Sequence, residues 1–311
     1  MTNIFRNKKI LVAGGTGLVG QQLVPKLIKL GAKVFVVSLD DKSLANKKIE
    51  DFYSLDLMNL DNCIKVTKNK EIIFNLLGVT GSPKINIEKP ASFMMSNIYC
   101  AINLLMAAQI SKVKKYLYTS TYGVYAHSAK MKESDVWKTF PSDNDKFAGW
   151  AKRIGELQIE AFKIEYNFDS LHIVRPANIY GPYDNFGEES TVIASLIKKG
   201  YHNDIINVWG DGSPIRDFIY SKDVARGMLH MVENNINVPV NLGSGVEVKI
   251  SDIANTIGKY FDKEVKYDKS KPNGDLRRQM NTNRAESVGF KSKYTLEQGL
   301  RETIKYYETI Q

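Results

Sequence analysis

The first half of the chain alternates short β-branched apolar runs with segments of helical periodicity. The strand-like runs cover residues 10–13, 34–37, 71–77 and 115–119. Helical patterns cover residues 18–30 and 91–108, and a third, over 147–165, leads to a further strand at 170–174. Near-continuous apolar strands that alternate with helices are typical of a parallel sheet covered on both faces. The pattern predicts an α/β fold with a doubly wound parallel sheet.

The second half mixes shorter elements. Pro176, Gly181 and Pro182 break the pattern, and helices are then expected over residues 192–199, 222–233, 252–261 and 296–307. Thr295 and Gln298 make a capping box for the last of these helices. No internal repeat or low-complexity linker is evident. We expect two closely packed domains, over residues 1–175 and mainly 176–311, with a segment at about 205–230 returning to the first; the second is a smaller, mixed α/β domain.

Composition places the chain among ordinary globular proteins. Of 311 residues, 43% are hydrophobic and 25% are charged, which excludes disordered, collagen-like and coiled-coil classes. Only Cys63 and Cys100 are present, and the four histidines are scattered, so we expect neither a disulfide framework nor a metal site. The first residues lack the apolar region of a signal peptide, and no apolar run approaches the roughly 20 residues that span a bilayer, so we expect neither a signal peptide nor a membrane span. The expected location is cytoplasmic, without a membrane partner.

The basic residues outnumber the acidic ones by 43 to 34, a net charge of +9. Such an excess suits nucleic acid, an anionic surface or a phosphate-bearing small molecule. The densest lysine clusters, at 112–115 and 263–271, are interleaved with acidic or apolar positions. This pattern favours a solvated lysine-rich surface, and we expect no nucleic-acid partner.

A glycine-rich turn directly follows the first predicted strand. Gly14, Gly17 and Gly20 give the spacing G-x-x-G-x-x-G between that strand and the first helix. The first glycine permits a tight turn, the second lets amides approach a pyrophosphate, and the third lets the helix pack on the sheet. The sequence predicts a Rossmann dinucleotide site, the alternative being a fold that has lost its cofactor. The remaining expected contacts within this turn are Thr16, Leu18 and Val19.

The second strand ends near a candidate ribose ligand. Asp40 lies twenty residues after Gly20, where a carboxylate can bind the adenosine ribose hydroxyls and repel a 2′-phosphate. No arginine follows the turn or this strand, which favours NAD(H) over NADP(H). Two features act against this preference: Ser38 occupies the more usual place of the acid, and Lys42 can neutralise a phosphate. Asp56 and Leu57 would suit the adenine edge or, alternatively, a helix cap.

Several further motifs carry a resemblance to a known family. They are Asn97, Ser120 to Tyr125 (STYGVY), Lys152 in AKRIGE, Arg175 to Pro182 (RPANIYGP), and residues 210–223. With the glycine turn, the chain resembles the extended short-chain dehydrogenase/reductase family, in its sugar-nucleotide branch. Residues 180–186 and 209–218 resemble the GDP-fucose synthase group, which acts on a GDP-linked 4-keto sugar. The resemblance makes the first domain NAD-binding and the second mainly nucleotide-sugar-binding.

The resemblance also implies catalytic roles. Thr121 matches the assisting hydroxyl, and Lys152 matches the lysine that binds the nicotinamide ribose. The acid/base tyrosine that normally stands four residues before this lysine is replaced by Ala148. Three explanations stay open. Another phenol or a water relay carries the proton, Lys152 and Thr121 suffice for slow turnover, or the chain binds NAD and a nucleotide sugar without catalysis.

Four tyrosines are candidates for the missing phenol: Tyr122, Tyr125, Tyr180 and Tyr183. Tyr122, adjacent to Thr121, is the one included among the expected catalytic residues. Further cofactor contacts implied by the resemblance are Leu77, Gly78, Ser120, Pro176 and Asn178. The implied substrate contacts are Tyr122, Asn178, Tyr183, Val208, Arg216 and Arg278.

Two of the implied substrate contacts, Arg216 and Arg278, have structural alternatives. Arg216 suits the substrate's diphosphate, the alternative being a salt bridge to Asp217 or Asp223. Arg278 is expected either as a second diphosphate contact or as an exposed surface residue. Asp223 is expected to have a structural role at a helix start.

The positions that epimerise the sugar in the GDP-fucose synthase group are changed in this chain. The cysteine and the histidine of that group are replaced by Gly123 and Tyr183, which disfavours double epimerisation. Hydride transfer at one carbon remains, at C4 of a GDP-hexose or GDP-heptose used for surface polysaccharide. Because the cellular NAD pool is largely oxidised, we expect oxidation to a 4-keto sugar. The alternatives are a 4-keto reductase, an epimerase or a non-catalytic binding protein; the resemblance implies a homodimer or tetramer.

Overall fold

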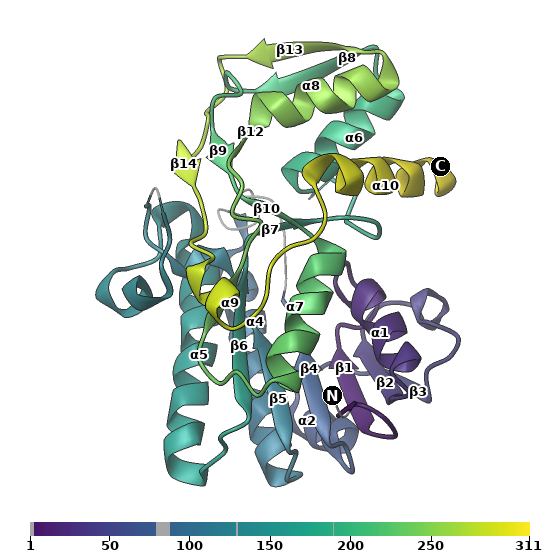
Figure 1. Cartoon of the computed structure of the whole chain (residues 1–311), viewed down its shortest axis with the longest axis vertical. Helices are drawn as coiled ribbons and strands as arrows, with labels where there is room; N and C mark the ends of the chain where they lie inside the picture. Colours follow the sequence, from purple (N-terminus) through teal and green to yellow (C-terminus); the bar gives the residue numbers. More distant parts are fainter. Residues whose placement is uncertain (1–2, 79–87, 129, 189) are drawn as a thin grey trace.

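The computed structural model describes residues 3–78, 88–128, 130–188 and 190–311. A large lobe is built around a parallel sheet, and a smaller lobe lies beyond one end of its strands (Figure 1). In the described residues this sheet has seven strands in the order β11-β6-β5-β4-β1-β2-β3. Their bounds are β1 Lys9–Ala13, β2 Lys33–Ser38, β3 Asp51–Ser54, β4 Ile72–Asn75, β5 Lys115–Thr119, β6 Leu171–Pro176 and β11 Val240–Leu242. The predicted doubly wound α/β fold is confirmed.

Helices cover both faces of this sheet. On one face lie α1 (Gly20–Lys29) and α7 (Ser221–Glu233), whose apolar side chains share a core with β1 and β6. On the other face lie α2 (Leu60–Thr67), α4 (Pro90–Ile110) and α5 (Lys146–Tyr166), which form a second core with β4 and β5. Two separate cores explain why the central strands are apolar on both sides.

The chain leaves the large lobe after β6 and later returns to it. The returning elements include α7, which packs against α1, β5 and β6, and β11, which pairs in parallel with β6; later in the chain α9 (Asn283–Ser287) packs against β11. The first returning segment is therefore residues 221–242, and it overlaps the expected range of 205–230 only in part. β8 (Ile205–Trp209), at the start of the expected range, pairs instead with β13 (Glu264–Asp268) in the small lobe.

The small lobe has its own core around Tyr180, Ile197 and Ile257. Its strands are short, and β7 (Asn178–Tyr180) pairs with β10 (Phe218–Tyr220) at the junction with the large lobe. The remaining elements of this lobe are α6 Val192–His202, β9 Ile215–Arg216, β12 Val248–Lys249, α8 Ile250–Phe261, β14 Arg277–Arg278 and α10 Leu296–Thr309. The predicted capping box of Thr295 and Gln298 at the start of α10 is confirmed.

Helix α4 corrects the expectation that no segment of the chain approaches the length and apolar character of a membrane span. Its 21 residues have a mean hydropathy of 1.4 in the most apolar window, so by length and composition it is able to cross a membrane. In this structure it packs against α2 and α5 and supplies buried residues to the second core. A core helix of a globular protein meets the same criteria, which makes α4 weak evidence for a membrane span.

Candidate active site

The glycine turn between β1 and α1 has the geometry that a pyrophosphate needs. Gly14 has a φ of +78°, which disfavours other residues. A Cβ on Gly20 would lie 2.5 Å from the carbonyl oxygen of Gly14, so α1 can pack this closely only on glycine. A Cβ on Gly17 would meet only the Gly14 oxygen, at 3.6 Å, because this position faces open space. The first turn of α1 carries no acidic side chain, so its N-terminus suits an anion.

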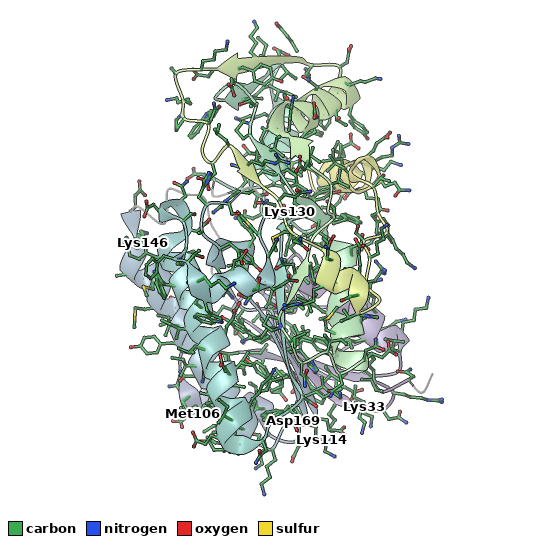
Figure 2. The ribbon with its side chains drawn as sticks, turned by 60° about the vertical axis from the view of Figure 1, so that its left-hand side comes forward. Lys33, Met106, Lys114, Lys130, Lys146 and Asp169 are labelled. Atoms are coloured by element: carbon green, nitrogen blue, oxygen red, sulfur yellow. The ribbon has the colours of Figure 1, made fainter. Side chains whose placement is uncertain are left out.

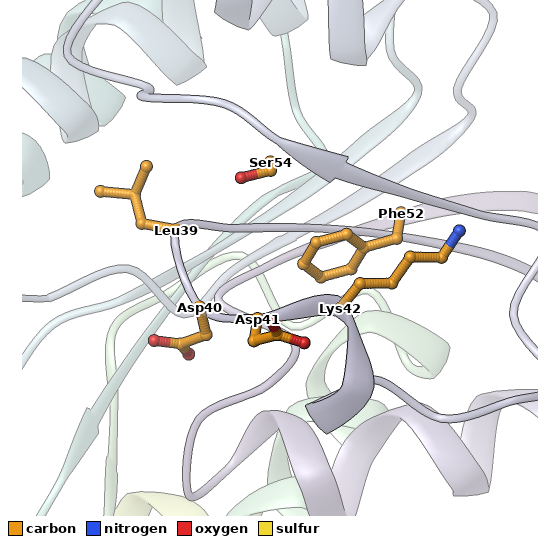
Figure 3. A pocket seen from close by; sticks show the side chains of 6 residues that line it. All are labelled: Leu39, Asp40, Asp41, Lys42, Phe52 and Ser54. Carbon is orange, nitrogen blue, oxygen red and sulfur yellow. The ribbon is translucent and has the colours of Figure 1, made fainter.

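Asp40 is tied to this turn by hydrogen bonds. The hydroxyl of Thr16 donates to Oδ2 of Asp40 at 2.5 Å, and Ser38 Oγ lies 3.1 Å from the same oxygen. The side chain is exposed and borders a shallow surface depression of about 510 Å³. Figure 3 shows the residues around it, Leu39, Asp40, Asp41, Lys42, Phe52 and Ser54. The structure therefore brings Thr16 and Asp40 together at the end of β2.

Asp56 and Leu57 follow β3 and lead into α2. The carboxylate of Asp56 accepts from the amide of Met58 at 2.8 Å, while Asn59 is the residue that caps α2. Leu57 is buried in the second core. Asp56 thus shapes the turn before the helix without being its cap, and the Leu57 side chain packs inward.

Lys152 reaches from α5 to the carboxyl ends of two neighbouring strands. Its Nζ donates to the carbonyl oxygens of Leu77 and Thr119, at 2.8 and 2.9 Å. A Cβ built on Gly78 would lie 3.3 Å from the same nitrogen. Burial lowers the pKa of Lys152 to about 8. Three residues expected at the cofactor site, Leu77, Gly78 and Lys152, are therefore adjacent.

The segment after β5 provides polar groups beside Lys152. Thr121 Oγ1 accepts from the amide of Gly123 at 3.2 Å and so caps the short helix η2 (Tyr122–Val124). The hydroxyl of Ser120 is buried without a hydrogen-bond partner in the described residues. A buried hydroxyl that lacks a partner is costly, and a bound cofactor or substrate would satisfy it. The residues present at this edge of the sheet fit a dinucleotide.

The hydroxyls of two of the four candidate tyrosines make hydrogen bonds to other residues of the protein. The hydroxyl of Tyr125 donates to Asn241 at 2.5 Å and accepts from Arg175 at 3.0 Å, inside the large lobe. The hydroxyl of Tyr180 donates to the carbonyl oxygen of Leu296 at 3.3 Å. Both tyrosines are buried. Because these two hydroxyls are held in hydrogen bonds within the protein, Tyr122 and Tyr183 are the better candidates for the missing phenol.

Tyr183 and Tyr122 have very different surroundings. Tyr183 is 43% exposed and packs against Tyr306 of α10, with ring centroids 4.5 Å apart and the ring planes tilted by 44°. Tyr122 lies under the guanidinium of Arg278, whose central carbon is 5.1 Å from the ring centroid. Burial raises the pKa of Tyr122, and the positive charges of Arg278 and Arg216 act to lower it. The structure thus places Tyr122 beside the small-lobe arginines, and no hydrogen bond joins it to Lys152 in the described residues.

The salt bridges considered for Arg216 are not formed. Asp217 accepts from the amide of Ser244 at 2.8 Å, and Asp223 pairs with Arg226. Arg216 donates to the carbonyl oxygen of its neighbour Ile215, and it has no carboxylate partner among the residues that the structure describes. Its positive charge is therefore available to an anion.

Arg278 is neither exposed nor free. It is 6% exposed, with Asp145 Oδ2 at 2.5 Å from Nη2 and Asp275 Oδ2 at 2.9 Å from Nε. The expectation of an exposed arginine is wrong, because two carboxylates and the small lobe enclose the side chain. Asp275 stands three residues before Arg278, a spacing visible in the sequence. The sequence contains no comparable signal for Asp145.

The other expected residues lie around the junction of the lobes. Asn178 Nδ2 donates to the Asp217 carbonyl oxygen at 2.9 Å, and Pro176 is the buried last residue of β6. Val208 is buried in the small-lobe core, so any contact with substrate would come from its main chain. Asp223 accepts from the amides of Lys293 and Tyr294, both at 2.9 Å, which fits its expected structural role at the start of α7.

These groups share one end of the large lobe. Figure 2 places Lys146, the first residue of α5, toward the small lobe, and Lys114 and Asp169 at the opposite end of the sheet. The glycine turn, Lys152 and Tyr122 all follow the carboxyl ends of strands or lie near them. Ligands of doubly wound sheets bind at this edge.

Comparisons with known proteins agree with this arrangement. The family model described as the NAD dependent epimerase/dehydratase family matches residues 10–243. The probable GDP-L-fucose synthase 1 of Oryza sativa subsp. japonica is 29% identical over 313 residues, covering 96% of this chain and 92% of that protein. The structure of the UDP-glucose 4-epimerase of Thermotoga maritima with UDP-glucose superimposes with a TM-score of 0.84, at 27% identity, covering 97% of this chain and 99% of that one. The GDP-mannoheptose C4 reductase of Campylobacter jejuni, solved with NADP, shares the fold, with a TM-score of 0.83 at 22% identity and 99% of each chain covered.

Proposed function

Because this chain belongs to the NAD dependent epimerase/dehydratase family, we propose that it is an oxidoreductase that uses NAD(H) to oxidise C4 of a GDP-linked hexose or heptose to a 4-keto sugar. The observation that carries the proposal is the position of Lys152, which bridges the carbonyls of Leu77 and Thr119 beside the glycine turn. A buried lysine at this edge suits a nicotinamide ribose. The 4-keto product would serve the synthesis of a surface polysaccharide sugar.

The preference for NAD(H) over NADP(H) is supported by Asp40. Its Oδ2 is bound by Thr16, and Oδ1 is left to accept from a ribose hydroxyl. A 2′-phosphate at this place would meet the negative charge of the carboxylate. The Campylobacter jejuni reductase that was solved with NADP is similar to this chain in fold, and the NADP is a property of that protein alone.

The GDP-sugar substrate is supported by the curated relatives and by one arginine. GDP-L-fucose synthases align over nearly the whole chain. Arg216, without a carboxylate partner in the described residues, projects a planar guanidinium near Tyr122 and suits a diphosphate. These observations support a nucleotide sugar lying between the lobes, with its diphosphate toward the small lobe.

When bound beside Lys152, NAD⁺ would supply the two-electron acceptor for the hydride of C4 of the sugar. Tyr122 accepts the proton of the C4 hydroxyl, so that the C–H and O–H bonds are lost and a C=O bond forms. Thr121 donates a hydrogen bond to the same oxygen, and Lys152 holds the nicotinamide ribose. Since burial raises the pKa of Tyr122, the phenolate form increases toward alkaline pH, and oxidation is expected to become faster as the pH rises.

Transfer at a single carbon is supported by the two changed epimerisation positions. Gly123 has no side chain, and Tyr183 is turned toward Tyr306 on α10. Glycine has no acid/base group, and the cysteine and histidine that exchange protons at the carbons next to the ketone in the GDP-fucose synthase group are therefore both missing.

The test is turnover of GDP-sugars followed by the absorbance of NADH. With NAD⁺ and a panel of GDP-hexoses and GDP-heptoses, we expect absorbance to rise and mass spectrometry to find a product lacking two hydrogens. Oxidation of NADH by 4-keto sugars alone would support the reductase, and isomerisation without net redox change the epimerase. Calorimetric binding of NAD⁺ and GDP-sugar without any turnover would overturn the enzyme proposal in favour of a binding protein.

We further propose a homodimer, or a tetramer built from it, through the paired helices α4 and α5. These helices pack side by side and leave apolar side chains exposed on both, among them Tyr99 and Leu157 at 43% and 54% exposure. Such a shared apolar face suits a twofold interface. Light scattering during gel filtration tests this, and a monomer at micromolar concentration would contradict it.

A further inference from the structure

A charged cluster joins the two lobes beside the active-site loop. Arg278 belongs to β14 of the small lobe, and Asp145 is the residue immediately before α5. Nη2 of Arg278 lies 2.5 Å from Asp145 Oδ2 and donates to Ser142 Oγ at 2.6 Å. One guanidinium therefore links the small lobe to the start of the helix that carries Lys152.

The second carboxylate of the cluster is also held across the lobes. Asp275 of the small lobe accepts from Asn144 Nδ2 at 2.8 Å, and His127 Nδ1 lies 3.5 Å from the same oxygen. Its other oxygen is 2.9 Å from Nε of Arg278. The cluster is thus a connected set of groups from both lobes, and no single pair can move without disturbing the others.

The cluster stands directly against the loop after β5. A Cβ on Gly123 would lie 3.3 Å from Cβ of Asp145 and 3.4 Å from its carboxyl carbon, so Asp145 lies close against this residue and a side chain there would crowd it. The Arg278 guanidinium covers the ring of Tyr122. Asp145 and Arg278 together enclose two consecutive residues of the active-site loop.

We propose that Asp145 and Arg278 are positioning residues that hold the Tyr122 phenol at a fixed place relative to the start of α5, and that they balance the charge around it. The inference rests on the proposed function of Tyr122 as proton acceptor. It assigns Arg278 to positioning, because two carboxylates already neutralise this side chain. The substrate diphosphate is then left to Arg216.

The charges of the cluster act on the pKa of Tyr122, and this pKa can be measured. Besides burial, the negative charges of Asp145 and Asp275 raise the pKa of Tyr122, and the positive charges of Arg278 and Arg216 lower it. Neutralising Asp145 should therefore lower this pKa, and neutralising Arg278 should raise it. Loosening of the loop alone would not move the pKa in opposite directions for the two variants.

The direct experiment is an ultraviolet difference titration of phenolate, with the Tyr122→Phe variant subtracted to isolate one tyrosine. We expect Asp145→Asn to lower the pKa of Tyr122, because a negative charge near the phenol is removed, and Arg278→Gln to raise it, because a positive charge is removed. Arg278→Lys keeps the charge and should restore a value near that of the wild type. His127→Gln removes the side chain that lies 3.5 Å from Asp275 and serves as a further control, from which we expect no change in the pKa of Tyr122.

Asp145 and Arg278 each have a nearby residue of the same type that serves as a matched control. Asp143→Asn changes an exposed carboxylate two positions before Asp145, and Arg277→Gln changes an exposed arginine that pairs with Glu247. Neither should move the pKa of Tyr122. Equal pKa values in the wild type and Asp145→Asn, or shifts of the same sign for both cluster variants, would overturn the positioning proposal.

Kinetics separate this proposal from the function on which it rests. In the oxidation assay the rise of kcat with pH should move to lower pH in Asp145→Asn and to higher pH in Arg278→Gln, in step with the titration. If Tyr122→Phe keeps the wild-type rate and pH profile, the role of Tyr122 as proton acceptor is wrong, and the titration still judges the positioning. If Tyr122→Phe stops turnover but the titration gives no shifts, the positioning is wrong and the catalytic role stands.

Discussion

Lys152 donates from Nζ to the carbonyl oxygen of Leu77 at 2.8 Å, with no carboxylate at ion-pair distance in the described part of the chain. Lys152 is 9% exposed, and burial lowers the pKa of its ammonium to about 8. The cation is held by two carbonyl oxygens and by the ring of Tyr118, whose centroid is 5.1 Å from Nζ, and such neutral groups stabilise a buried cation poorly in the absence of ligand. The site therefore stores an unfavourable interaction that cofactor binding can relieve.

The first prediction concerns the stability of the cofactor-free protein as a function of pH. Between about pH 8 and 10.5 the unfolded chain holds a proton on Lys152 and the folded chain does not, so stability from this residue rises with pH. Relative to Lys152→Met, the wild type should gain about 3 kcal/mol across this window. Urea unfolding of both proteins at neutral and alkaline pH measures the difference; a constant difference would show that the lysine titrates normally.

The second prediction tests whether the glycine turn between β1 and α1 binds the pyrophosphate of NAD(H). Gly17→Val should abolish NAD(H) binding because the new side chain occupies the open space next to α1, while the unfolding free energy changes by less than about 0.5 kcal/mol. Gly14→Val is the contrasting variant, since its φ of +78° should cost at least about 1–2 kcal/mol of stability. Calorimetry and thermal melts report the two quantities. Normal NAD(H) binding by a folded Gly17→Val protein would refute the phosphate turn.

The third prediction concerns cofactor choice. The wild type should bind NAD(H) more tightly than NADP(H), and Asp40→Ser should improve NADP(H) binding by roughly tenfold, because a charge that repels the 2′-phosphate is removed. Asp41→Ser is the matched control, since Asp41 is the adjacent carboxylate and caps a short helix through the amide of Ser43. Titration calorimetry with both cofactors decides the matter, and a wild type that prefers NADP(H) would contradict it.

The fourth prediction addresses the tyrosine missing at position 148. Tyr122→Phe should lower the rate of hydride transfer by roughly 10²–10⁴-fold, the usual contribution of one acid/base group. Ala148→Tyr, on the first turn of α5 and four residues before Lys152, should recover part of that loss in the double variant. Steady-state kinetics with a GDP-hexose or GDP-heptose measure both. A rate that is indifferent to either change, in an enzyme that turns over, would place the acid/base elsewhere.

The fold was largely predictable because its signals are local. The apolar run Lys115–Thr119 is the strand β5, and the helical period at 91–108 becomes α4 (Pro90–Ile110). Helix α2 (Leu60–Thr67) was not predicted, since eight residues give too little periodicity. The return of residues 221–242 to the large lobe was misplaced because sheet pairing between β6 and β11 depends on tertiary contacts that no window of sequence contains.

The motifs of the candidate site could be predicted from the sequence, but the partners of its charged side chains could not. The spacing of Gly14, Gly17 and Gly20 has one local meaning, and the turn has the expected geometry. The partners of Arg278 depend on long-range packing, with Asp145 more than a hundred residues away. The surroundings of Tyr122 follow from that packing, so its nearness to two arginines became visible only in three dimensions.

The return of the chain to its first lobe constrains how this protein is made. The hydrogen-bonding edge of β6 is complete only when β11 pairs with it, and β11 ends at Leu242. During synthesis that edge stays open while the intervening part of the small lobe emerges from the ribosome, and an open strand edge invites pairing with other chains. A chimaera that joined residues 1–176 to a foreign small lobe would retain the open edge permanently. Completion of the large-lobe sheet therefore depends on synthesis of the small-lobe chain that lies between β6 and β11.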